Sequence, residues 1–131
     1  MSKEQTMKKI ISTEKAPKAI GPYSQAVKAG NMLFISGQIP LDPVTMEIAG
    51  KTAPEQAEAV FKNLAAILSE AGYGFEHVVK TTVYLKDMGD FAAVNEVYAR
   101  HFSGDFPARA AFAVAALPRN ALVEIEAIAV I

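Results

Sequence analysis

Residues 122–131, at the C-terminus, place the strongest constraint on the fold. Their side chains alternate between two faces, as in an extended strand. One face is wholly apolar, whereas the other is mostly apolar but carries Glu124 and Glu126. A layer of helices can cover only one face of a sheet, so the second face needs a different cover. The sequence therefore predicts a strand whose apolar face lies under helices and whose carboxylates point away from them.

Two segments have the periodicity of amphipathic helices. Thr52 and Glu55 form a capping-box pattern, and the apolar stripe that follows ends near Gly72. A second helix is expected from about residue 90 to residue 102. Its inner face would carry four apolar or aromatic residues: Phe91, Val94, Tyr98 and Phe102.

Strands are expected at residues 8–13, 32–39, 78–85, 109–117 and 121–131, separated by glycine and proline turns. Pro118, Arg119 and Asn120 separate the last two, which is typical of a hairpin. The order β-β-α-β-α-β-β predicts an α+β fold, a single mixed sheet with two helices on one face. The chain has 131 residues, and we expect residues 1–131 to form one domain.

The strand predicted at residues 109–117 has a bulky face with Phe112 and a second face with Arg109 and Ala111. The simplest arrangement places the Arg109 face beside the Glu124 face, both turned away from the helices. That surface is too apolar for water, so we expect it to meet neighbouring subunits. Arg109 and Glu124 are then either an interface ion pair or a site for a small carboxylate, which a guanidinium binds with two prongs.

Composition argues against several classes of protein. The chain has no cysteine, so it has no disulfide, thiolate nucleophile or cysteine-bound metal. Its 13 basic residues are scattered and the net charge is −1, which makes nucleic-acid binding an unfavoured function. No segment approaches the roughly 20 apolar residues of a membrane span. We therefore expect no membrane association and a cytoplasmic location. His77 and His101 lack ligand spacing, so we expect no metal.

Four blocks of sequence resemble the motifs of the RidA (YjgF) family and follow one another in the family's order. They are AIGPYSQA at residues 19–26, FISGQIP at 34–40, VKTTVYLKD at 79–87, and PARAA at 107–111 with VEIEA at 123–127. The resemblance implies a chorismate-mutase-like fold that assembles as a homotrimer, with sites in the clefts between subunits. It also implies hydrolysis of 2-imino and 2-aminoacrylate-type enamine substrates to 2-keto acids and ammonia, without a cofactor.

The resemblance assigns catalytic roles to four residues. Arg109 matches the residue that binds the substrate carboxylate, and Glu124 matches the one that places or activates water. Tyr23 and Ser36 match residues that line the site. The sequence pattern without the resemblance favours simple loop packing for Tyr23 and an ordinary strand position for Ser36.

Three further residues match positions that contact the substrate: Gly37, Asn95 and Ala111. Many members of the family have a cysteine where this chain has Ala111, so only the backbone is available here. Two rival functions stay open. A trimer that binds small carboxylic metabolites without turnover would use the same arginine, and an endoribonuclease activity has been attributed to some relatives. Release of ammonia from a freshly formed imine distinguishes the enzyme from the binding protein, and RNA cleavage at physiological salt would favour the endoribonuclease.

Overall fold

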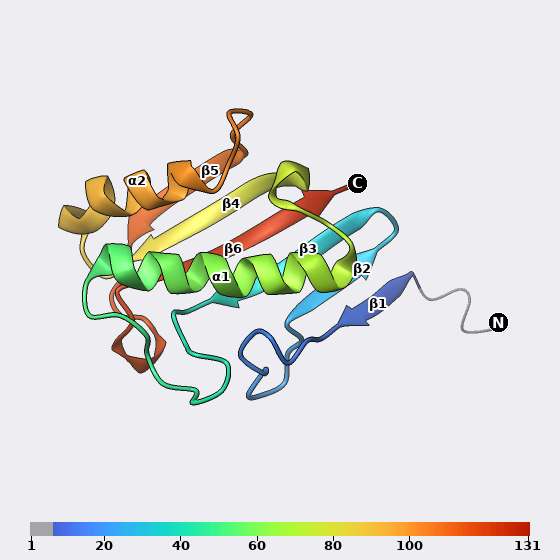
Figure 1. The fold of residues 1–131 in the computed structure, drawn as a ribbon, viewed down its shortest axis with the longest axis horizontal. Coiled ribbons are helices and arrows are strands. Elements are labelled where there is room, and N and C mark those ends of the chain that lie inside the picture. Colours follow the sequence, from blue (N-terminus) through green and yellow to red (C-terminus); the bar gives the residue numbers. More distant parts are fainter. Residues whose placement is uncertain (1–6) are drawn as a thin grey trace.

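The computed structural model describes residues 7–131, which form one mixed sheet of six strands with two helices on one face (Figure 1). The strands are β1 (Lys8–Ile11), β2 (Ala26–Ala29), β3 (Met32–Gln38), β4 (Val78–Leu85), β5 (Ala108–Ala113) and β6 (Val123–Val130). The helices are α1 (Ala53–Ala71) and α2 (Phe91–Arg100). The predicted fold class is confirmed.

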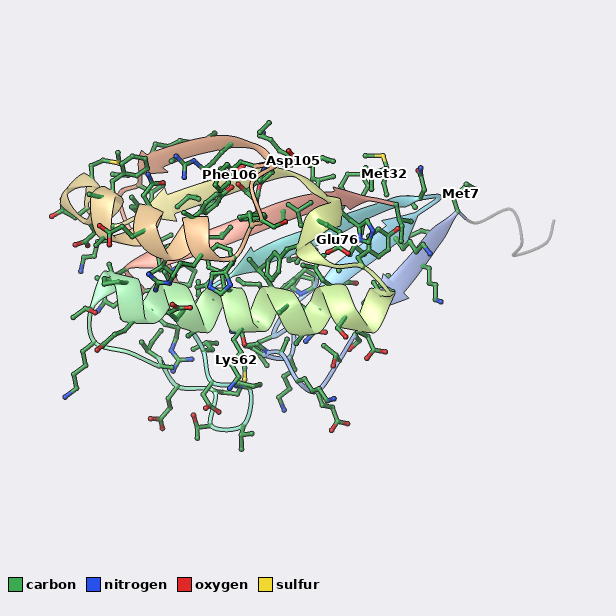
Figure 2. All side chains as sticks on the ribbon, turned by 45° about the horizontal axis from the view of Figure 1, so that its top comes forward. Met7, Met32, Lys62, Glu76, Asp105 and Phe106 are labelled. Carbon is green, nitrogen blue, oxygen red and sulfur yellow. The ribbon has the colours of Figure 1, made fainter. Side chains whose placement is uncertain are left out.

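The long helix α1 begins and ends where the sequence predicts. The Thr52 side chain accepts a hydrogen bond from the Glu55 amide, and the Glu55 carboxylate accepts one from the Thr52 amide. Gly72 ends the helix in a left-handed conformation with φ of 84°. Its apolar stripe packs against β3 and β6. Lys62 lies on the opposite side of α1 and points away from the sheet (Figure 2).

The central strand β6 has the two faces expected of it. Val123, Ile125 and Ala129 are completely buried beneath the helices. Residues on the other face are only half-buried, and this face also exposes 41% of Phe34 and 45% of Phe112. Apolar residues therefore stand in solvent on the side of the sheet that the helices do not cover.

The predicted hairpin between the last two strands is wrong. The sheet order is β1-β2-β3-β6-β4-β5, so β4 lies between β5 and β6. β5 pairs with β4 in parallel, and all the other neighbours are antiparallel. Parallel strands need a long crossover, which residues 86–107 supply through α2. Arg119 and Asn120 adopt left-handed conformations in a 3-10 turn, and the chain continues from the edge of the sheet to its centre.

This topology also corrects the predicted faces. Thr81 of β4 is paired with Arg109 on one side and with Ala127 on the other. Cross-strand partners share a face, so Arg109 lies on the helix side with Ala127. Tyr84 is paired with Glu124 and lies on the open face. The expectation that Arg109 and Glu124 share one face is therefore wrong, because their strands meet only through β4.

One strand was not predicted. β2 has only four residues, Ala26–Ala29, and forms an antiparallel hairpin with β3 through Gly30, whose φ is 61°. Its short AVKA sequence carries little strand signal of its own, and pairing with both β1 and β3 stabilises it. Within residues 7–131, neither helix has the length and apolar character needed to cross a bilayer.

Candidate functional site

Arg109 stands on the edge strand β5, beside α2. Its Nη1 donates a hydrogen bond to Asn95 Oδ1 at 2.6 Å. The guanidinium carbon lies 4.8 Å from the centre of the Tyr98 ring and 5.3 Å from that of Phe91. A cation over an aromatic face is attracted by the ring quadrupole. An exposed arginine on a sheet edge is thus held by three side chains of a single helix.

The three supporting residues share one face of α2. Phe91, Asn95 and Tyr98 are spaced four and three positions apart, which places them above one another on a helix. Phe91 and Tyr98 were predicted only as core residues. Tyr98 is indeed buried, with its hydroxyl 2.6 Å from Thr81 Oγ1, and burial is the main reason that its pKa is raised. An asparagine between two aromatic residues at this spacing was the sequence signal for their second role.

A pocket of about 400 Å³ opens beside the guanidinium. It is lined by Asn95, Tyr98, Ala99, Phe106, Pro107 and Arg109. Figure 2 shows Phe106 next to Asp105 in the loop between α2 and β5. An apolar wall with one cation and one amide fits a small organic anion, because the guanidinium can bind a carboxylate through paired N–H groups.

Glu124 lies on the open face, and its carboxyl group is half-buried. Its pKa is raised from the usual value, first by burial and second by the negative charge of Glu126. The carboxylate lies directly over Gly37, where an added methyl group would overlap Oε2 and approach Cδ to 2.9 Å. Gly37 falls where the register between β3 and β6 shifts. A carboxyl group whose pKa is raised above its usual value is better matched to proton transfer.

Ser36 lies within β3, and Tyr23 lies in the loop before β2. The Ser36 hydroxyl donates to the Ser24 carbonyl at 2.6 Å, which ties the Tyr23 loop to the strand. Tyr23 is 54% exposed, and with Gly37 it lines a hollow of about 290 Å³. Ser36 lines a neighbouring hollow of about 350 Å³ that also includes Glu126.

The residues singled out from the sequence therefore form two groups. Arg109 and Asn95 meet on the helix side of β5, while Glu124 and Gly37 meet on the open face. The Ala111 side chain faces the helices and packs against the core. Since the sheet separates the two groups, one chain by itself cannot bring Arg109 and Glu124 into one pocket.

Both histidines have structural partners. His77 Nδ1 accepts from the Gly74 amide at 2.9 Å, and His101 Nε2 lies 2.9 Å from a Glu58 oxygen while its ring stacks on Phe61. Over residues 7–131, no three histidine or acidic side chains gather in a way that could hold a metal ion. The chemistry that the described residues offer is an arginine for an anion and a carboxyl group for a proton.

The fold and the site define a small α+β domain with an arginine beside a pocket on its edge strand. The family model described as Endoribonuclease L-PSP matches residues 13–131. A mouse protein named 2-iminobutanoate/2-iminopropanoate deaminase is 56% identical, over 95% of this chain and 92% of its own length. The chain belongs to this family, the RidA (YjgF) family.

Solved structures agree with this assignment. RidA from an Antarctic Psychrobacter species superposes with a TM-score of 0.91 at 51% identity, over 94% of this chain and 99% of that one. TdcF from E. coli, solved with bound serine, superposes with a TM-score of 0.89 at 45% identity, over 94% and 98%. The resemblance stated from the sequence motifs is confirmed at the level of the family and of the fold.

Proposed function

We propose that this protein hydrolyses 2-imino acids, and the 2-enamines that tautomerise to them, to 2-keto acids and ammonia. The observation that carries the proposal is Arg109, whose guanidinium is held by Asn95 and Tyr98 at the wall of a pocket for a small anion. The name of the mouse relative specifies this reaction. The serine bound to TdcF is an amino acid with a free carboxylate, the group that Arg109 would bind.

The complete site in this proposal lies between two copies of the chain. The Arg109 pocket of one copy would meet Glu124, Gly37, Ser36 and Tyr23 on the open face of the next. The partly exposed apolar residues of that face would then be covered by protein. A closed ring of copies gives each Arg109 pocket one open face to meet. We propose that the ring is a homotrimer, as the resemblance to the RidA family implies.

The reaction in this site needs only water. Arg109 binds the substrate carboxylate and thereby orients the imine carbon, which is a proximity effect. Glu124 accepts a proton from a water molecule as its oxygen bonds to that carbon. That proton passes to the nitrogen and gives a carbinolamine. The carbinolamine hydroxyl then loses its proton through Glu124 to the nitrogen, the C–N bond breaks as the C=O bond forms, and ammonia and the keto acid leave. An enamine is first protonated at its terminal carbon. No electrons are exchanged with the protein, so the proposal includes no cofactor. We also propose that the protein acts in the cytoplasm.

A coupled assay tests this proposal. An amino-acid oxidase or threonine dehydratase would generate imines from several amino acids, and the rate of imine loss and of ammonia release would be recorded with and without the protein. Arg109→Ala is the informative variant. Arg100→Ala is the matched control, because Arg100 is on α2 but pairs with Glu58 at 2.7 Å, away from the pocket.

The same assay distinguishes the rival functions. Faster imine loss that requires Arg109 supports the deaminase. Binding of a 2-keto acid without any acceleration would identify a carboxylate-binding protein instead. Cleavage of RNA at physiological salt, with no effect on imines, would support the endoribonuclease activity after which the family model is named.

A further inference from the structure

Thr81, Tyr98 and Arg109 form a closed triangle of contacts between the sheet and α2. Thr81 and Arg109 are cross-strand partners on the helix side of β4 and β5. The Thr81 hydroxyl is 2.6 Å from the hydroxyl of Tyr98, and the Tyr98 ring lies beneath the guanidinium at 4.8 Å. The helix is therefore tied to the sheet directly behind the cation.

Without Tyr98, Arg109 would keep only its hydrogen bond to Asn95 and its contact with the Phe91 ring. It is exposed and stands on the outermost strand of the sheet, which has β4 as its single neighbour among the described residues. A free arginine side chain has many rotamers, and ordering it to grip a ligand costs conformational entropy. Restraint that exists before the ligand arrives lowers that cost.

Asn95 and Tyr98 restrain the guanidinium in complementary ways. Asn95 Oδ1 takes one N–H of Nη1, which leaves the edge formed by Nε and Nη2 available for a carboxylate. A single hydrogen bond still allows the group to tilt about it. The ring of Tyr98, on one side of the guanidinium, opposes that tilt.

We infer that Tyr98 is a positioning residue for Arg109: its buried ring, anchored through its hydroxyl to Thr81, holds the guanidinium in the orientation that binds a carboxylate with two prongs. The inference rests on the proposed function only for the identity of the ligand, a small 2-keto or 2-imino carboxylate. Tyr98 itself acts through Arg109, and its hydroxyl is directed into the protein towards Thr81.

Two substitutions distinguish the contribution of the Tyr98 ring from that of its hydroxyl group. Tyr98→Phe keeps the aromatic face but loses the bond to Thr81, whereas Tyr98→Leu loses the face as well. Tyr73→Phe is the matched control, because Tyr73 is also buried and its hydroxyl donates to the Asn31 carbonyl at 3.0 Å, away from Arg109. The two Tyr→Phe variants therefore each lose one buried hydroxyl bond, but only one of them lies beneath the guanidinium.

The first readout is the NMR signal of the Arg109 Nε–H group. Protons over an aromatic face are shifted by the ring current, so the wild-type signal should be displaced from that of exposed arginines. The displacement should persist in Tyr73→Phe, shrink in Tyr98→Phe and be largely lost in Tyr98→Leu. The second readout is the Kd of 2-ketobutyrate measured by calorimetry. We expect Tyr98→Leu to weaken binding by about 2- to 30-fold, the range of a cation–π contact, and Tyr98→Phe to weaken it less.

Several results would overturn the inference. They are an unshifted Arg109 signal in the wild type, a wild-type Kd in Tyr98→Leu, equal effects of Tyr98→Phe and Tyr73→Phe, and absence of 2-ketobutyrate binding by the wild type. If Tyr98→Leu does not fold, the comparison of Tyr98→Phe with Tyr73→Phe in both readouts tests the inference. If both readouts behave as expected but the wild type does not accelerate imine loss, the positioning role stands and the proposed function fails.

Discussion

Arg109 and Glu124 lie on opposite faces of the same sheet. Thr81 of β4 is paired with both Ala127 of β6 and Arg109 of β5, so all three residues lie on the helix side. Tyr84, three residues later on β4, is paired with Glu124 on the open face. The two residues that the proposed reaction needs are therefore separated by the backbone of the sheet. A site that uses both must be built from two copies of the chain.

The first prediction is that inactive variants complement each other. In a cyclic trimer each site would take Arg109 from one copy and Glu124 from another, so a mixture of Arg109→Ala and Glu124→Ala chains contains some intact sites. For random mixing of equal amounts, about a quarter of the sites are intact, because the two chains at each interface are drawn independently. Co-expression of differently tagged variants, followed by the imine assay, measures this recovery.

The result depends on the oligomer. We expect light scattering at micromolar concentration to give the mass of three chains, because a monomer would leave Phe34 and Phe112 exposed on the open face. A monodisperse monomer, or mixed samples no more active than either variant alone, would show that the site is not shared between copies.

The second prediction concerns the specificity of Arg109. Loss of one partner of a desolvated charge pair typically costs about 2–5 kcal/mol. At about 1.4 kcal/mol per tenfold, Arg109→Ala should lower kcat/KM on 2-imino acids by about 30- to several thousand-fold. Arg109→Lys should recover only part of this loss, because an ammonium keeps the charge but not the two-pronged geometry. An imine without a carboxylate is the control substrate, and an equal loss on both substrates would mean that Arg109 maintains structure.

The third prediction follows from the raised pKa of Glu124. A general base must be ionised, so turnover should fall on the acid side with a midpoint above the usual glutamate value of 4.5. Glu124→Gln should abolish the acid limb together with most of the activity. Glu126→Gln should retain activity and move the limb to lower pH, because it removes one of the two causes of the shift, while burial, the larger cause, persists. An acid limb unaffected by either change would assign it to another group.

The titration of Glu124 should also make the stability of the folded protein depend on pH. Because folding raises the pKa of Glu124, the folded state prefers the protonated carboxyl group. That contribution is present below pH 4.5 and is lost as the pH rises through the raised value. The melting temperature of the wild type, relative to Glu124→Gln, should therefore decrease over this range. A difference that is constant with pH would contradict the raised pKa.

The fourth prediction uses the contact between Gly37 and Glu124. A methyl group at Gly37 would overlap the carboxylate, and the flexible end of Glu124 can move away without disturbing the backbone. Gly37→Ala should therefore lower kcat while the melting temperature and the Kd of 2-ketobutyrate at Arg109 stay near wild type. A large loss of stability would instead show that the glycine is required by the irregular pairing of β3.

Much of the fold could be predicted because its signals are local. The α1 capping box, the apolar stripe of that helix and the alternation in β6 each depend on neighbours a few residues away, and the structure has each of them as expected. The short strand β2 could not be predicted in this way, because its four residues are stabilised by partners on both sides and not by their own pattern.

The sequence alone determined the family, the α+β class, the boundaries of α1 and the identity of Arg109 and Glu124 as the residues of interest. Alternation within a strand shows which side chains share a face of that strand, but it does not say which faces of two strands meet. That choice depends on which strand lies between them, and only the tertiary structure placed β4 between β5 and β6. The register of β4 then sends Arg109 towards α2, where Tyr98 supports it, and leaves Glu124 on the opposite face, because partners across a ladder must point to the same side.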